Sequence, residues 1–270
     1  MINYNCLLGL LTIIPWVSCD NKPNDRFIDF GGKKQHILDL GEGEPTVVFI
    51  TGMNCGLQFF DSVQREVSKL TRTLGYDRSG LGKTDILDTT RTIDQMTEEL
   101  NRILLSENFK EPYILVGHSY GGAVARYFVH KYPEKTAGIV FVDCANDEIF
   151  FDSLILTNKR SKEELYSVDT TASIGEQLEM KYVSYNDSIL RQVEFKTTIP
   201  THLLIATNIP GFPQDLMKIR INTYRQFNMF APQMKYIYTE KSGHHIQKDE
   251  PQLVIQSIKE VMNEVSANRR

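Results

Sequence analysis

The sequence has little of what a nucleic-acid-binding or a multi-span membrane protein needs. Its 270 residues carry a net charge of -4, and no cluster of Lys and Arg alternates with aromatic side chains. A phosphate backbone would therefore find no basic surface, and we expect no nucleic acid as a partner. No apolar run is long enough to cross a bilayer. Repeats and low-complexity segments are also missing, and apolar residues make up 41% of the chain, as in globular proteins. The length fits one domain with an inserted subregion.

Cysteine is scarce as well, with four residues in the whole chain. Cys6 and Cys19 stand near the N-terminus, which leaves Cys55 and Cys144 for the folded body. Two isolated cysteines make a poor disulfide framework and lack the spacing of metal ligands. We interpret both as small apolar residues near strand ends. The sequence predicts no metal site, and the chemistry inferred below requires no cofactor.

The N-terminus differs in pattern from the rest of the chain. A short apolar run, Leu7 to Val17, is followed by Ser18 and Cys19 and then by a polar stretch, residues 20–26. This pattern resembles a bacterial lipoprotein signal. The resemblance implies that residues 1–19 end at a lipidated Cys19, that 20–26 form a tether, and that the protein is anchored to a membrane of the cell envelope. The alternatives are an ordinary cleaved signal of a secreted or periplasmic protein, or an apolar helix packed on the core.

Buried strand patterns and helical patterns alternate along most of the chain. Continuous apolar runs, typical of strands buried on both faces, are separated by segments with apolar residues at helical spacing. Thr92, with Gln95 three residues later, predicts a capping box at the start of one helix. This alternation predicts a parallel sheet with helices on both sides. The expected strands are 27–30 and 35–40, which form a hairpin, and then 46–51, 73–76, 112–116, 137–142, 202–206 and 234–238; the expected helices are 59–70, one from 92, 123–131, 213–230 and 251–265.

The alternation stops between about residues 148 and 196. This stretch is charged, rich in tyrosine and helical in pattern, so we expect a small helical cap inserted over the sheet. Its aromatic side chains have two readings: they line an apolar substrate pocket, or they simply pack at helical spacing. The residues concerned are Phe150, Phe151, Tyr166, Tyr182 and Tyr185.

A candidate nucleophile lies in the segment Gly117 to Gly122, which reads Gly-His-Ser-Tyr-Gly-Gly. The Gly-x-Ser-x-Gly pattern follows a predicted buried strand directly and opens a predicted helix, the strand-turn-helix setting of a nucleophile elbow. Glycines at 117 and 121 suit so tight a turn. Ser119 is therefore predicted to project its hydroxyl above the sheet.

A serine hydroxyl needs a base within hydrogen-bond reach. Of the six histidines, two stand together in Ser242-Gly243-His244-His245, a loop between the last strand and the last helix. The other four fall on strands, on a helix face, or beside the serine, where His118 is expected to point away from the site if Ser119 points into it. They are His36, His118, His130 and His202.

The elbow and this closing loop together resemble the α/β-hydrolase fold family, over about residues 27–265. The resemblance implies a mostly parallel eight-stranded sheet with helices on both faces and a helical cap. The family's base follows a glycine in the closing loop, which matches His244, with His245 as the alternative. The loop Thr51-Gly52-Met53 resembles the family's oxyanion loop, which implies that the backbone N–H groups of Met53 and Tyr120 stabilise a developing oxyanion. Asp77 and Arg78 resemble a structural loop of the family, and we expect an internal tie there.

The triad acid has three candidates. The usual position follows the penultimate strand, but after Ala206 no carboxylate occurs before Asp215. Some lipase-like members of the family place the acid after the strand that follows the elbow helix, and in this chain that position is Asp143. Asp143 is the predicted acid, and the alternatives are Asp215, Asp147 or no acid at all.

These residues predict a serine hydrolase that cleaves a carboxylic ester, or a related acyl bond, of a small-molecule substrate through an acyl-enzyme. The fold and triad do not choose among esters, thioesters, lactones and amides. Two other functions remain open: an acyltransferase on the same scaffold, and a ligand-binding protein of this fold without catalysis.

Overall fold

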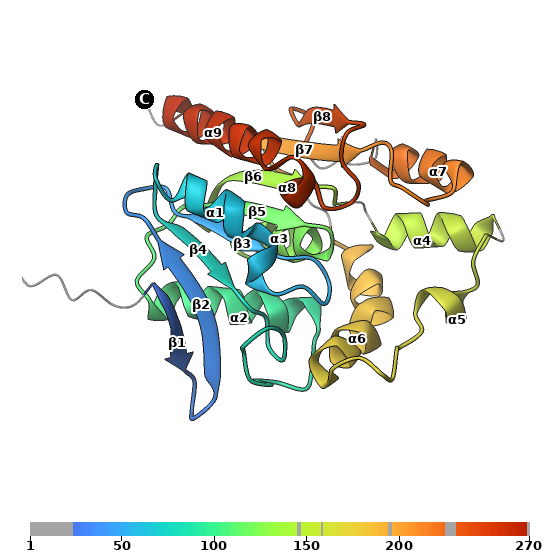
Figure 1. Cartoon of the computed structure of the whole chain (residues 1–270), viewed down its shortest axis with the longest axis horizontal. Coiled ribbons are helices and arrows are strands. Elements are labelled where there is room, and N and C mark those ends of the chain that lie inside the picture. The colour runs from blue at the N-terminus through green and yellow to red at the C-terminus, as the bar shows by residue number, and fades with distance from the viewer. Residues whose placement is uncertain (1–23, 145–146, 158, 194–195, 225–230, 269–270) are drawn as a thin grey trace, which may run out of the picture.

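The computed structural model describes residues 24–144, 147–157, 159–193, 196–224 and 231–268. The predicted signal with Cys19 and the side chain of Asp147 lie outside the described residues. Within them, eight strands form one sheet in the order β1-β2-β4-β3-β5-β6-β7-β8 (Figure 1). The first two strands are paired antiparallel to their neighbours, and from β4 onward all pairs are parallel. The strands are β1 (Asp25–Asp29), β2 (Lys34–Leu40), β3 (Val47–Ile50), β4 (Thr73–Tyr76), β5 (Tyr113–His118), β6 (Thr136–Val142), β7 (Thr201–Ala206) and β8 (Lys235–Thr239).

Helices cover both faces of this sheet, as the apolar runs predict. One face carries α1 (Asp61–Val67), the short α8 (Ile246–Asp249) and α9 (Pro251–Asn268), whose apolar residues share a core with β3, β5 and β6. The other face carries α2 (Ile93–Ser106) and α3 (Tyr120–Lys131) over a second core. Every residue of β3, β5 and β7 is buried, because each of these strands lies between the two layers. The predicted α/β architecture is therefore confirmed.

The expected helical insertion follows β6. It consists of α4 (Asp147–Leu156), α5 (Lys162–Leu165) and α6 (Ile174–Leu190), and the chain then returns to the sheet as β7. Helix α7 (Gln214–Tyr224) comes after β7 and packs against α4 at the same end of the molecule (Figure 1). Two of the cap aromatics, Phe150 and Phe151, pack with Phe212 and Leu216 in a small core between α4 and α7. Tyr185 is 53% exposed.

Element boundaries differ from the sequence prediction at two places near the predicted site. The helix expected over 59–70 is a 3₁₀ turn, Leu57–Phe60, followed by α1, because Phe60 leaves the helical region at the junction. Helix α3 starts at Tyr120 rather than at 123, because Ser119 itself is the N-cap. The predicted capping box of α2 is present, with both bonds between Thr92 and Gln95. No helix in the described ranges is long and apolar enough to cross a membrane.

Candidate active site

Ser119 lies in a sharp turn between β5 and α3. Its backbone has φ 50° and ψ -124°, a conformation that a residue with a side chain rarely adopts and that costs about 1–3 kcal/mol. The Ser119 N–H donates to the carbonyl of Val142 on β6 at 3.1 Å, which fixes the turn to the neighbouring strand. In the part of the chain that the structure describes, no hydrogen bond involves the Ser119 hydroxyl. The residue thus has the strained strand-turn-helix geometry of a nucleophile elbow.

The elbow requires its glycines because α3 starts in contact with neighbouring backbone. A Cβ on Gly121 would lie 2.2 Å from the carbonyl oxygen of Ile50 at the end of β3. A Cβ on Gly117 would lie 2.7 Å from the Cα of Gly122. Both distances are far below van der Waals contact, so a side chain at either position would push α3 off the sheet.

The structure brings Asp143 and His244 together. Asp143 directly follows β6, the strand next to β5, and its Oδ2 lies 2.6 Å from Nδ1 of His244. The carboxylate is completely buried, whereas the histidine side chain is 34% exposed. Asp143 also has a positive φ of 46°. A short bond from Nδ1–H to a carboxylate leaves Nε2 as the nitrogen that can accept a proton, which is the arrangement a general base needs.

Two residues of α7 complete the surroundings of Asp143, and the sequence reasoning missed both. The Arg220 guanidinium donates to Asp143 Oδ2 at 2.8 Å, and the Tyr224 hydroxyl donates to Oδ1 at 3.0 Å. Burial alone raises the pKa of Asp143, but the charge of Arg220 and the hydrogen bond from His244 outweigh burial and lower the pKa to about 2. The acid is therefore ionised at neutral pH. Arg220 and Tyr224 stand four residues apart, so they share one face of α7, and this spacing was the signal that the sequence offered. Nothing in the sequence shows which carboxylate this face meets.

The structure corrects the prediction for His118. Its ring does not point away from the site but lies against His244, with ring centroids 4.7 Å apart. The His118 Nε2–H donates to the backbone carbonyl of His244 at 2.9 Å. The side chain is nearly completely buried, and burial, together with the neighbouring His244, lowers the pKa of His118 to about 3. His118 is therefore a neutral support of the loop that carries His244.

The alternative base His245 and the alternative acid Asp215 form no comparable pair in the described structure. His245 contacts the rings of Phe59 and His118 and makes no bond to Asp143 among the described residues. Asp215 has a side chain that is 55% exposed, and it pairs with Lys159 at 2.5 Å, away from either histidine. The geometry favours His244 as the base and Asp143 as the acid.

The loop predicted to carry one oxyanion donor lies against the elbow. Gly52 to Cys55 form a turn closed by a bond from Cys55 N–H to the Gly52 carbonyl at 3.2 Å, with Asn54 at φ 57°. A Cβ on Gly52 would lie 3.3 Å from the Cβ of Ser119, so the turn packs directly on the serine. Tyr120 is the first residue of α3, where backbone N–H groups have no partner within the helix. In the described structure neither the Met53 nor the Tyr120 amide donates a hydrogen bond, so both are free for an anion.

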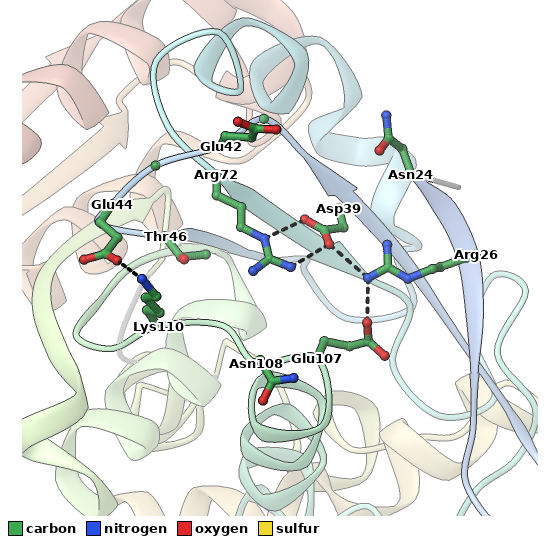
Figure 2. Close-up of a pocket in the computed structure, with 12 residues that line it drawn as sticks. Asn24, Arg26, Asp39, Glu42, Glu44, Thr46, Arg72, Glu107, Asn108 and Lys110 are labelled. Carbon is green, nitrogen blue, oxygen red and sulfur yellow. Dashed lines mark hydrogen bonds and ion pairs between the residues drawn. The ribbon is translucent and has the colours of Figure 1, made fainter. Parts of the chain in front are cut away.

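A cavity of about 510 Å³ lies at the opposite end of the sheet from Ser119 (Figure 2). Arg72 and Lys110, which line it, precede β4 and β5, so it borders the amino ends of these strands, whereas Ser119 follows a carboxyl end. Asp39 accepts bonds from Arg72 and Arg26, and Arg26 also pairs with Glu107. These charges compensate one another and tie β1, β2 and α2 together, so we interpret the cavity as structural.

Comparisons with known proteins support the fold. A family model described as the alpha/beta hydrolase fold matches residues 45–172. Among solved structures, a thermophilic esterase from Thermogutta terrifontis has a TM-score of 0.62 at 18% identity, covering 89% of this chain and 97% of that one. An epoxide hydrolase from Bacillus megaterium, solved as its M145A mutant, has a TM-score of 0.68 at 15% identity, covering 88% of this chain and all of the other. The chain thus has the α/β-hydrolase fold.

A curated relative extends this likeness over most of the sequence. The uncharacterised protein YbdG of Bacillus subtilis is 26% identical over 212 residues, which are 76% of this chain. The match spans 64% of the length of YbdG. The relatives therefore support the fold, and the reaction has to be argued from the site.

Proposed function

We propose that this protein is a serine hydrolase that cleaves a carboxylic ester, or a related acyl bond, through an acyl-enzyme. The observation that carries the proposal is the 2.6 Å contact between Asp143 and His244 beside a strained Ser119. Of the four residues other than glycine with a positive φ in the described structure, three belong to this site: Asn54, Ser119 and Asp143. Strain of this kind persists where the surrounding structure enforces it, and it gathers at active sites.

We infer the reaction from the chemistry of these three side chains. His244 Nε2 takes the Ser119 proton as Oγ attacks the acyl carbon, and Asp143 stabilises the imidazolium that results. The carbonyl oxygen becomes an oxyanion facing the amides of Met53 and Tyr120. His244 then protonates the leaving group. In the second half, His244 activates a water molecule, which releases the acid and restores the serine.

A serine nucleophile favours an acyl carbon over an epoxide carbon. Attack of a hydroxyl on an acyl group gives an ester, which water can hydrolyse by the same route in reverse. Attack on an epoxide carbon would give an ether between Ser119 and the substrate, with no carbonyl through which water could release it. Although some structures with this fold are epoxide hydrolases, Ser119 therefore supports acyl transfer in this chain.

The test is labelling by a fluorophosphonate, followed by hydrolysis of p-nitrophenyl esters of increasing acyl chain length. The wild type is expected to take up one label and to hydrolyse at least part of the series. Ser119→Ala should lose the label and nearly all turnover, a fall of about 10⁶ if the triad acts as a unit. His244→Gln should show a comparable loss, and His245→Gln, the matched control, should stay near wild type.

The outcomes separate the alternative functions. A labelled protein that releases product only when an alcohol or amine acceptor is added is an acyltransferase. A protein that takes no label and hydrolyses none of the esters is not a serine hydrolase, and the proposal fails. Retention of a tenth of wild-type turnover in Ser119→Ala would remove Ser119 as the nucleophile.

We also propose that the enzyme is held at a membrane of the cell envelope through a lipidated Cys19. The apolar run before Ser18 and the abrupt change to polar residues after Cys19 support this proposal. The tether expected over residues 20–26 is shorter than predicted, because strand β1 begins at Asp25. One acyl chain alone binds a membrane only marginally, so stable anchoring needs more than one chain.

A further inference from the structure

Arg78, expected only as an internal tie, is one of the most completely buried large side chains in the described structure. Its guanidinium forms a bidentate pair with Glu179 of α6, with Nε–Oε1 at 2.6 Å and Nη2–Oε2 at 2.9 Å. The remaining donors bind the Thr51 carbonyl at 2.6 Å, the Gly52 carbonyl at 2.8 Å and the Thr51 hydroxyl at 3.3 Å. All five N–H groups of the guanidinium are thus used, three of them on the loop that leads to Met53.

Glu179, the partner of Arg78, also binds the loop that contains Met53. This carboxylate is fully buried, and its Oε2 accepts a bond from the Asn54 N–H at 3.0 Å. Burial raises the pKa of Glu179, but the charge of Arg78 outweighs burial and keeps the net pKa below its usual value. The carboxylate therefore stays charged, and it accepts from both Arg78 and the loop.

The ion pair fixes both peptide planes that flank Met53. In a planar trans peptide the C=O and the next N–H point in opposite directions. Because Arg78 holds the Gly52 carbonyl, the Met53 N–H must point away from Arg78. Glu179 holds the Asn54 N–H and so fixes the plane on the other side of Met53. The orientation of the first predicted oxyanion donor is therefore set by Arg78 and Glu179.

The same cap helix also holds the residue that carries the second donor. Asn186 is fully buried on α6, and its Nδ2 donates to the Tyr120 hydroxyl at 2.7 Å. Its Oδ1 accepts from the Ile93 N–H at 2.8 Å, which ties α6 to the start of α2. At the start of α6, Gly175 packs on Gly80, and a Cβ on Gly175 would lie 2.0 Å from the Gly80 carbonyl oxygen. Gly175, Glu179 and Asn186 share the buried face of α6.

We propose that helix α6 positions the oxyanion hole, with Glu179 acting through Arg78 on the Met53 loop and Asn186 acting through the Tyr120 ring. The inference rests on the proposed function and assigns the cap a part in transition-state stabilisation. Arg78, Glu179 and Asn186 are positioning residues, since none of them contacts Ser119 in the described structure. A buried ion pair adds little net stability compared with apolar residues of similar volume, which leaves orientation of the loop as its effect.

The test compares Glu179→Gln with Glu99→Gln. Glu99 is a close match, because it is buried, pairs with Arg91 at 2.7 Å and accepts one backbone N–H, that of Ser79. Its pair does not touch the Met53 loop. In Glu179→Gln an amide NH₂ group replaces one carboxylate oxygen, so a donor faces the N–H groups of Arg78 or Asn54 instead of an acceptor. The loop then loses its fixed orientation.

Three readouts are taken: kcat and KM for the best p-nitrophenyl ester, the inhibition constant of an alkyl boronic acid, and hydrogen exchange of the 52–55 amides. A boronic acid adds the Ser119 oxygen to boron and places an oxygen in the oxyanion hole. Glu179→Gln should lower kcat about 10- to 100-fold with KM within about twofold, below the 10²–10³-fold effect of deleting a donor. The inhibition constant of the boronic acid should rise by the same factor by which kcat/KM falls, and the 52–55 amides should exchange faster. Glu99→Gln should change none of these.

Equal kinetics and equal exchange in the two variants would overturn the inference. If Glu179→Gln does not fold, Tyr120→Phe removes only the hydroxyl that Asn186 holds, and it should lower kcat a few-fold with KM unchanged; no change in kcat would count against α6 as a positioning element. A wild type that neither reacts with the fluorophosphonate nor hydrolyses esters defeats the proposed function instead. Amide exchange requires no activity, so it still decides whether α6 braces the loop.

Discussion

Replacing Asp143 with Asn tests the acid of the proposed triad. The substitution keeps the shape of the side chain but removes the charge that faces His244 Nδ1 at 2.6 Å. The amide favours the wrong imidazole tautomer and no longer stabilises the imidazolium. We expect kcat to fall by about 10⁴, which corresponds to about 5.4 kcal/mol of transition-state stabilisation, with little change in KM.

The structure adds a second consequence. Asp143 is completely buried and pairs with Arg220, whose side chain is 7% exposed. Removing the charge of one partner of a buried ion pair lowers the free energy of unfolding by about 3–5 kcal/mol. A double variant, Asp143→Asn with Arg220→Met, removes both charges. It should recover most of the lost stability but none of the lost turnover.

The assay combines ester kinetics at 25 °C with urea unfolding for the wild type, both variants and a control. Asp215→Asn is the control, because that carboxylate is exposed and paired with Lys159. It should behave as wild type in both measurements. If Asp215→Asn shows the large loss while Asp143→Asn stays near wild type, the acid belongs after the penultimate strand. Recovery of turnover in the double variant would show that the loss came from instability and not from the triad.

Three further predictions follow from other parts of the molecule. Burial keeps His118 neutral, with a pKa of about 3 in the folded protein against 6.5 in the unfolded chain. The stability that depends on a neutral His118 is therefore fully present above pH 6.5 and is lost as the pH falls towards 3. By pH 4.5 the free energy of unfolding of the wild type should have fallen by about 3 kcal/mol for this reason. Urea unfolding should show that the acid-induced loss is smaller by this amount in His118→Gln than in wild type. Gly121→Ala should lower the free energy of unfolding by about 3 kcal/mol, because the new Cβ meets the Ile50 carbonyl at 2.2 Å; a wild-type Tm would contradict the tight elbow. Membrane-extracted protein should begin at an acylated Cys19 by intact mass, and a product that starts at Met1 would refute the anchor.

The α/β architecture was predictable because burial on both faces leaves a direct trace in the sequence. Strands such as β5 and β7 are continuous apolar runs, and each is followed by a segment with helical spacing. The elbow was predictable for a related reason: Gly117 and Gly121 stand at a strand-to-helix junction, where only small residues permit close approach. These are local constraints, so the residues that satisfy them lie close together in the sequence.

The surroundings of the acid had to come from the tertiary structure. Asp143 and Arg220 are 77 residues apart in the chain, and they meet because α7 folds back over the end of β6. His118 illustrates the same limit, since its position next to Ser119 suggested that it turns away from the site, whereas its ring packs on a loop more than a hundred residues later. Contacts of this kind depend on which helices, strands and loops the fold brings together. The periodicity of apolar residues does not record that.

The sheet, the elbow with Ser119, and a small set of candidate bases and acids could be predicted from the residues alone. Only the folded chain brings Asp143 to His244, and only there does Glu179 of α6 pair with Arg78, 101 residues away, beside the loop that contains Met53. The physical reason is that apolar periodicity and glycine placement record how each segment packs on its own layer. The pairing of buried charges depends on which segments the folded chain brings together, and no local pattern encodes that.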